Sequence, residues 1–124
     1  MKIQECISRH MMTEFLNLCM DELELDNSAP GIVLINEPYI HAGGKNTFGM
    51  FNGKDIMVVV KDRHPMDVFR TLAHELTHWK QQTTGMEMSG EDGSDAENAA
   101  NAIAGIILRK FGERYPDYFI NSLP

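Results

Sequence analysis

Long apolar runs are missing from this chain, although 43% of its 124 residues are hydrophobic. A membrane-spanning helix needs about 20 consecutive apolar residues, so the composition excludes a membrane protein. The amino terminus has no signal-like apolar core and carries an acidic residue as early as Glu5, so secretion is not expected. We therefore expect a cytoplasmic protein.

Basic residues are few and scattered. The chain has 11 lysines and arginines against 18 aspartates and glutamates, which gives a formal net charge of −7. Proteins that bind nucleic acids or anionic membranes usually present a basic patch or stripe. The absence of such a stripe from the sequence disfavours nucleic acids and anionic membranes as partners. We also expect the protein to be a monomer.

Cysteine is equally scarce, with only Cys6 and Cys19 in the chain. If both lie in one helix, the interval between them separates their backbones by about 20 Å, which is too far for a disulfide. Neither belongs to a C-x-x-C pair, so a zinc ribbon is not expected. Two buried thiols in a reducing compartment are the simpler interpretation.

Hydrophobic periodicity predicts elements in the order α, β, β, β, α, α within a single domain that spans residues 1–124. Helices are expected over about residues 2–25, 65–82 and 95–112, and strands over 32–36, 47–51 and 55–60. Asn52-Gly53-Lys54 predicts a hairpin between the last two strands, and residues 37–46 predict a loop. The expected fold is α+β, with a small, three-stranded, mainly antiparallel sheet packed against helices.

His74-Glu75-Leu76-Thr77-His78 is an H-E-x-x-H pentapeptide inside the second predicted helix. Histidines four residues apart project from one helix face, so both imidazoles can reach one metal ion. Glu75 is displaced around the helix, where it can hold a water molecule instead of the metal. A zinc hydrolase needs this division of roles, with neutral nitrogen ligands and an adjacent general base.

A third ligand is needed, because catalytic zinc usually has three protein ligands. Glu97 follows His78 after eighteen residues and opens the third predicted helix. In this motif and spacing, over about residues 64–111, the chain resembles the gluzincin metallopeptidases, including small, single-domain, minigluzincin-like members. The resemblance implies a zincin-like fold, Zn²⁺ bound by His74, His78 and Glu97, and Glu75 as the general base.

The same family often has an aspartate four residues after the ligand glutamate, where it accepts a hydrogen bond from the first histidine. This chain has Asn101 at that position. An amide oxygen also accepts from an imidazole N–H, although it lacks the charge that raises the basicity of the ligand. We therefore expect Asn101 to support His74 from outside the ligand set.

A peptidase must also hold its substrate in an extended conformation, which an exposed strand edge can do by adding the peptide as another strand. The resemblance implies that the strand containing Thr47, Phe48 and Gly49 forms the upper rim of the cleft. The alternative is an ordinary hairpin strand with no such role.

Hydrolysis further requires a donor that stabilises the oxyanion. Several gluzincin families have a tyrosine after the ligand helix, which suggests Tyr115 or Tyr118 in this chain. Tyr39, His41 and His64 are competing candidates, each of which can equally be a surface or packing residue.

The expected function is that of a zinc-dependent metallopeptidase acting on a peptide or protein substrate. One alternative is a non-catalytic, zinc-stabilised regulatory or binding protein, such as a phage or bacterial accessory protein. Another is a zinc hydrolase of a non-peptide amide. Glu75 favours an enzyme over a structural zinc protein, because a purely structural site needs no general base.

Overall fold

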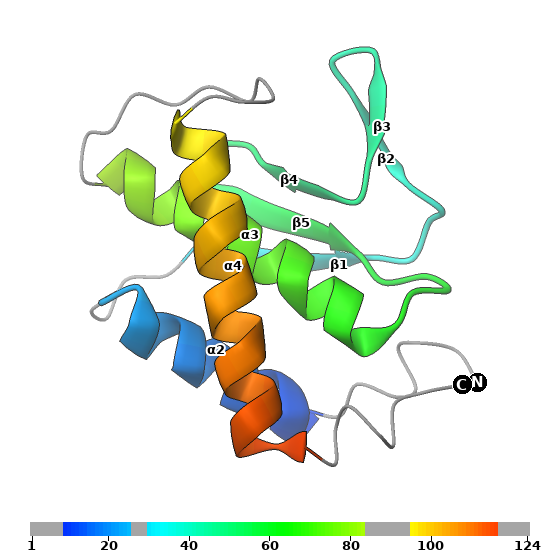
Figure 1. Ribbon diagram of the computed structural model, residues 1–124. Coiled ribbons are helices and arrows are strands. Elements are labelled where there is room, and N and C mark those ends of the chain that lie inside the picture. Colours follow the sequence, from blue (N-terminus) through cyan, green and yellow to red (C-terminus); the bar gives the residue numbers. More distant parts are fainter. Residues whose placement is uncertain (1–8, 26–29, 84–94, 117–124) are drawn as a thin grey trace.

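The computed structural model describes residues 9–25, 30–83 and 95–116 (Figure 1). The described elements are α2 (Arg9–Glu22), β1 (Gly31–Ile35), β2 (Ile40–Ala42), β3 (Lys45–Thr47), β4 (Gly49–Phe51), β5 (Asp55–Val59), α3 (Pro65–Thr83) and α4 (Asp95–Arg114). These helices and small sheets form an α+β fold, as expected. None of the described helices is long and apolar enough to cross a membrane.

The three-stranded sheet has the order β1-β5-β4, so β5 is its central strand. The predicted hairpin is confirmed, because β4 and β5 pair antiparallel across the turn that begins at Asn52. The Asn52 side-chain oxygen accepts a hydrogen bond from the backbone N–H of Asp55 at 2.7 Å. Gly53 has a φ of 92°, which glycine adopts without steric cost.

The expectation of a mainly antiparallel sheet is wrong for β1. This strand runs parallel to β5, with Gly31 opposite Asp55 and Ile35 opposite Val59, so the three-stranded sheet is mixed. A short apolar run predicts a buried strand but does not specify its partner or direction. Parallel pairing needs a connection of about a dozen residues or more, and residues 36–54 provide one.

A second correction concerns residues 37–46, which contain a hairpin in place of the expected loop. β2 and β3 pair antiparallel, with Ala42 opposite Lys45. The two glycines that indicated a loop, Gly43 and Gly44, form the turn with φ values of 60° and 77°. Two-residue hairpin turns favour residues that tolerate positive φ at both positions. The β2–β3 hairpin stands away from the three-stranded sheet (Figure 1).

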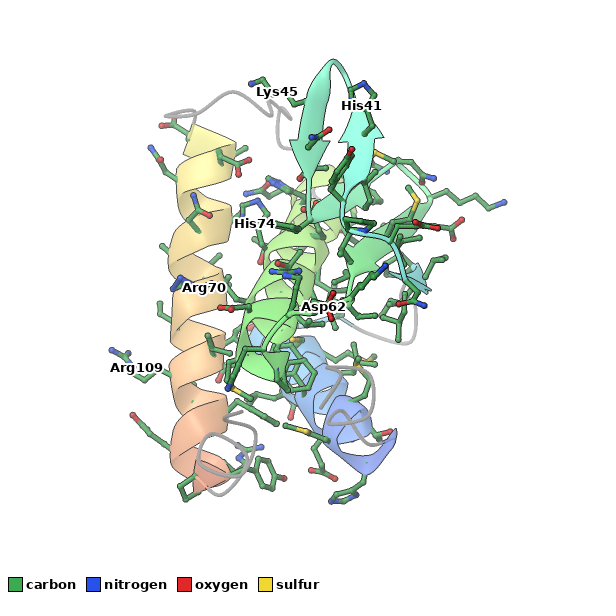
Figure 2. All side chains as sticks on the ribbon, turned by 90° about the vertical axis from the view of Figure 1, so that its right-hand side faces the viewer. His41, Lys45, Asp62, Arg70, His74 and Arg109 are labelled. Carbon is green, nitrogen blue, oxygen red and sulfur yellow. The ribbon has the colours of Figure 1, made fainter. Side chains whose placement is uncertain are left out.

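The helices pack around an aromatic cluster to which each contributes one phenylalanine. The Phe15 ring of α2 stacks on Phe69 of α3 at 4.4 Å, and Phe111 of α4 contacts them edge-on at 5.1 and 5.5 Å. All three side chains are fully buried, which stabilises the fold by roughly 1.5–3 kcal/mol each. Seen from the side, α3 lies between the sheet and α4 (Figure 2). The cluster therefore fixes α4 against the outer face of α3.

The cysteine prediction is tested only in part. Cys19 is a buried free thiol in α2, and burial raises its pKa above the ordinary value. This matches the expected buried thiol. Cys6 lies outside the described residues, as do residues 2–8 of the predicted first helix.

Candidate metal centre

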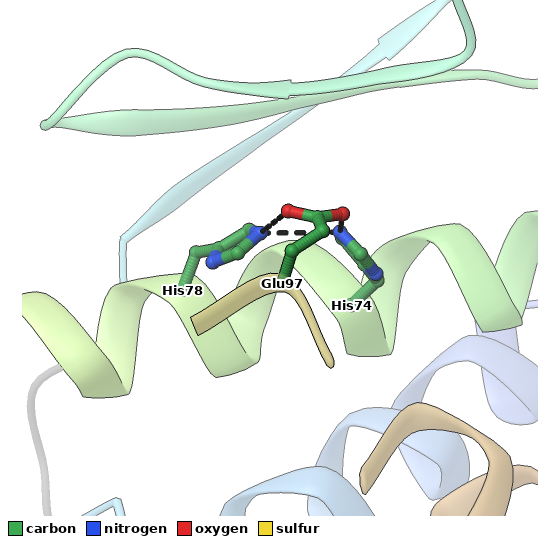
Figure 3. A group of neighbouring side chains, drawn as sticks. All are labelled: His74, His78 and Glu97. Atoms are coloured by element: carbon green, nitrogen blue, oxygen red, sulfur yellow. Dashed lines mark hydrogen bonds and ion pairs between the residues drawn. The ribbon is translucent and has the colours of Figure 1, made fainter. Parts of the chain in front are cut away.

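His74 and His78 lie one turn apart on α3, and Glu97 faces them from the first turn of α4 (Figure 3). The apolar face of α3 is buried, which fixes the rotation of the helix and directs both histidines towards α4. On α4 the buried residues Ala100 and Ala104 are small, so the two helices can approach closely. Helix packing thus joins residues that are far apart in the sequence.

The three side chains converge on one point. His74 Nε2 lies 2.8 Å from Glu97 Oε1, and His78 Nε2 lies 3.1 Å from Glu97 Oε2. The two imidazole Nε2 atoms are 3.1 Å apart. Two nitrogen ligands of one tetrahedral metal ion such as zinc lie about 3.3 Å apart, so these side chains could hold a metal ion.

The protonation state of His74 also suits metal binding. Burial lowers the pKa of His74, and the neighbouring His78 lowers it further. The Glu97 carboxylate and a side-chain hydrogen bond with Asn101 act in the opposite direction, but the net pKa shift is downward. Metal ions bind the neutral imidazole, so the lowered pKa favours the ligating form. Asn101 is thus next to His74, and its supporting role in metal binding stays a prediction.

Gln81 is a further supporting residue, which sequence reasoning missed. Its Nε2 donates to the backbone carbonyl of Ala96 at 2.9 Å, and its Oε1 lies 2.8 Å from His78 Nδ1. The carbonyl only accepts, so the Gln81 amide oxygen faces His78 and the imidazole Nδ1 must be the donor. This tautomer leaves the lone pair of His78 Nε2 free for a metal. The signal in the sequence is the position of Gln81 three residues after His78.

Outer-sphere partners of this kind usually contribute 10–100-fold to metal affinity. We therefore expect Gln81→Ala and Asn101→Ala each to weaken zinc binding by roughly 10–100-fold. A competition titration against a chromophoric chelator measures this affinity. Gln82→Ala is the matched control, because Gln82 is exposed and its amide donates to the Gly53 carbonyl. Parental zinc affinity in Gln81→Ala would show that the His78 tautomer is not set by Gln81.

Glu75 lies beside the histidines with only 8% of its surface exposed. Burial raises the pKa of Glu75 to about 7, with a further increase from the Glu97 charge and an opposing effect of His78. A carboxyl group with a pKa near neutrality can both accept and release a proton at physiological pH. Its environment therefore suits a general base.

A cavity of about 260 Å³ opens beside this group. Thr47, Phe48 and Gly49 line one part of it, and His74 and Glu75 line another. The segment predicted to hold the substrate therefore lines the same cavity as the predicted metal ligand His74 and the predicted base Glu75. The predicted strand over residues 47–51 is wrong in its bounds: only Gly49–Phe51 forms β4, an edge strand of the three-stranded sheet, whereas Thr47 ends β3 and Phe48 lies between the two strands.

Gly49 is in close contact with α3. A Cβ atom at this position would overlap the Thr71 methyl group and lie 3.1 Å from Glu75 Oε2. A side chain at residue 49 therefore has no room unless β4 moves away from α3. Glycine here allows the backbone at the cavity rim to lie directly against the candidate base.

We expect Gly49→Ala to lower the free energy of unfolding by about 1–3 kcal/mol, the usual cost of overpacking. Thr71→Ser removes the methyl group that blocks the new Cβ and keeps the hydroxyl, so the double variant should recover part of the loss. Denaturant unfolding measures both, with Thr71→Ser alone as the control. Equal destabilisation in Gly49→Ala and in the double variant would contradict the steric explanation.

Arg63 holds the cavity rim, formed by Thr47, Phe48 and Gly49, against α3. The sequence did not reveal this role. Its guanidinium donates to the Thr71 hydroxyl at 2.8 Å and to the Val59 carbonyl at 2.9 Å. It also lies over the Phe48 ring, 4.6 Å from the centroid. Arg63 therefore links the residue that precedes β4 to the helix that carries the histidines.

The prediction of Tyr115 as an oxyanion donor is wrong. Its hydroxyl donates to the Glu14 carboxylate of α2, and its ring packs on Phe111. Tyr115 follows Glu97 by eighteen residues, which along a helix is about 27 Å, so it lies at the opposite end of α4 from the metal centre. Tyr118 lies outside the described residues and stays a prediction.

The competing oxyanion candidates are also outside the cavity lining. His41 pairs with Asn46 across the β2–β3 hairpin at 3.0 Å. His64 Nδ1 accepts from the backbone N–H of Met66 at 3.0 Å and so caps the start of α3. Tyr39 is half exposed just before β2. Among the residues that line the cavity in the described part of the chain, none of these three occurs.

Comparison with known protein families, curated proteins and solved structures finds no match for this chain. The resemblance to gluzincins therefore rests on the motif and its spacing. The chemistry of the site itself is the remaining indication of function.

Proposed function

We propose that this chain is a zinc-dependent metallopeptidase with a zincin-like fold. The observation that carries the proposal is the convergence of His74, His78 and Glu97, whose ligand atoms lie within 4.8 Å of one another. Structural zinc sites usually have four protein ligands, whereas catalytic sites have three and leave one position open. Among the described residues the group offers three ligands, which supports a catalytic site.

Glu75 supports hydrolysis over a purely structural role. It is buried on the cavity wall next to both histidines, where the fold stabilises its protonated form. Burial of this kind destabilises a charged carboxylate. A protein with a purely structural zinc site would gain nothing from a buried carboxyl group at this position. The non-catalytic alternative therefore has less support than the enzyme.

When bound, zinc supplies Lewis acidity that polarises a substrate carbonyl and makes water a stronger acid. Glu75 accepts a proton from the attacking water as the water oxygen bonds to the carbonyl carbon. Glu75 then donates this proton to the amide nitrogen as the C–N bond breaks, which restores its carboxylate. Gln81 and Asn101 keep the imidazoles oriented throughout.

The substrate is proposed to lie along the rim formed by Thr47, Phe48 and Gly49. An extended peptide can pair with an edge strand through main-chain hydrogen bonds, and β4 is such an edge. Because the rim and Glu75 line one cavity, a peptide on the rim would present its backbone to the base. This arrangement favours a peptide over a small non-peptide amide.

Incubation of the zinc-loaded protein with a mixed peptide library tests the proposal. Mass spectrometry should detect new termini, which a chelator abolishes and added zinc restores. A protein that binds zinc but cleaves no peptide would be the non-catalytic binding protein instead. Cleavage of small amides alone would indicate the non-peptide hydrolase.

A further inference from the structure

Residues spaced by four on α3 and α4 form two facing rows. The rows consist of Arg70, His74 and His78 on α3 and of Glu97, Asn101 and Gly105 on α4. His78 contacts Glu97, and His74 hydrogen-bonds Asn101. Arg70 and Gly105 form the third pair of the two rows. Arg70 Nη2 lies 3.4 Å from the place that a Cβ atom would occupy if residue 105 had a side chain. The first two pairs belong to the candidate metal centre, whereas the pair of Arg70 and Gly105 has no role in it.

Arg70 is a cation that no described residue pairs with. Within the described part of the chain it forms no hydrogen bond or ion pair, and its side chain is exposed. Arg63, which precedes α3, is different, because it donates three hydrogen bonds to the protein. Arg70 lines the cavity that also contains His74 and Glu75. Its guanidinium is therefore available to a molecule bound in that cavity.

The absence of a side chain at Gly105 lets the Arg70 guanidinium reach across to α4 (Figure 2). A guanidinium presents its N–H donors as a planar fork that matches the two oxygens of a carboxylate. The chain as a whole carries a net charge of −7, which repels anions. A substrate carboxylate consequently needs a local cation, and Arg70 is the arginine that lines the cavity.

We propose that Arg70 determines specificity by binding a carboxylate of the substrate two to four residues from the hydrolysed bond. This inference rests on the proposed peptidase function. Arg70 is four residues from His74 on α3, and Gly105 is eight residues from Glu97 on α4, which correspond to about 6 and 12 Å along the helices. An extended peptide covers this range in about two to four residues. The carboxylate belongs either to an acidic side chain or to the C-terminus of the peptide.

Three peptide sets separate these sources. The first is neutral with amidated ends, the second carries one glutamate at each successive position, and the third is neutral with a free C-terminal carboxylate. The parent is compared with Arg70→Gln and with Arg109→Gln. Arg109 is an exposed arginine on α4 that points away from α3, so it controls for the change in net charge (Figure 2). Unchanged thermal melting verifies that both variants fold.

Two readouts are compared, kcat/KM for cleavage and peptide affinity for the zinc-loaded Glu75→Gln protein by fluorescence anisotropy. We expect the parent to favour one carboxylate set by about 10–100-fold, the range expected for charge-assisted hydrogen bonds. Arg70→Gln should abolish this preference, Arg70→Lys should keep part of it, and Arg109→Gln should keep all of it. Preference for the second set identifies an acidic side chain, and preference for the third identifies a C-terminal carboxylate.

The outcomes distinguish the subsite from the peptidase. Carboxylate-dependent binding through Arg70 without cleavage would keep the subsite and overturn the proposed function. Cleavage with no carboxylate preference, or with a preference that survives in Arg70→Gln, would overturn the subsite and keep the peptidase. Neither binding nor cleavage of any set would overturn both.

Discussion

Glu75→Gln is expected to reduce peptide hydrolysis by roughly 10²–10⁴-fold or more, the contribution of general base catalysis. Glutamine keeps the size and hydrogen-bonding capacity of the side chain but cannot accept a proton. The proposed ligands His74, His78 and Glu97 are untouched, so the variant should still bind about one zinc. Initial rates on a cleaved peptide, together with the zinc content, measure both effects. Hydrolysis at the parental rate would show that Glu75 is not the base.

The metal-free form of the same variant provides a fold control. Burial raises the pKa of Glu75 from its ordinary value of 4.5 to about 7, so the folded protein binds the proton more tightly than the unfolded chain. The stability that this proton confers is present below pH 4.5 and is lost as the pH rises through 7. Glutamine is neutral at every pH. In chelator, Glu75→Gln should therefore be more stable than the parent above pH 7, by up to roughly 3 kcal/mol, and equally stable near pH 4.

Glu97→Ala is expected to weaken zinc binding by more than about 100-fold, which exceeds the loss for an outer-sphere partner. The change removes the anionic ligand of the group and leaves two neutral imidazoles. Competition titration measures the affinity, and Asp95→Ala is the matched control because it removes the same charge from the same first turn of α4, where Asp95 is exposed. Full zinc retention in Glu97→Ala would exclude Glu97, and weakened binding in Asp95→Ala would reassign the ligand.

The local part of the site could be predicted from the sequence. Two histidines four residues apart share a helix face whatever the rest of the fold does, so His74 and His78 follow from the motif alone. The convergence of Glu97 depends on how α4 packs on α3, and the sequence indicated it through the spacing and the family resemblance. The lengths of α3 and α4 were predictable as well, because the expected ends at residues 82 and 112 lie within two residues of the observed ends at Thr83 and Arg114, whereas α2 ends at Glu22, three residues before the expected end.

The remaining features depend on tertiary contacts that no local pattern encodes. In the sequence, Gln81 looks like any polar residue near a helix end. Its role depends on the hydrogen bond to the Ala96 carbonyl, which fixes the orientation of its amide group. The parallel direction of β1 is set by the path of the chain and not by its apolar composition. Tyr115 was a foreseeable error, since the length of the helix that follows Glu97 already separates the two residues by about 27 Å.

A crystal structure of the zinc-loaded protein, with anomalous diffraction measured at the zinc absorption edge, tests whether His74, His78 and Glu97 bind a catalytic zinc ion. We expect one anomalous peak at about 2.0–2.2 Å from His74 Nε2, His78 Nε2 and a carboxylate oxygen of Glu97. The remaining coordination position should face the cavity between Glu75 and Gly49. A peak at another site, or a fourth protein ligand that closes the coordination sphere, would contradict a catalytic zinc centre.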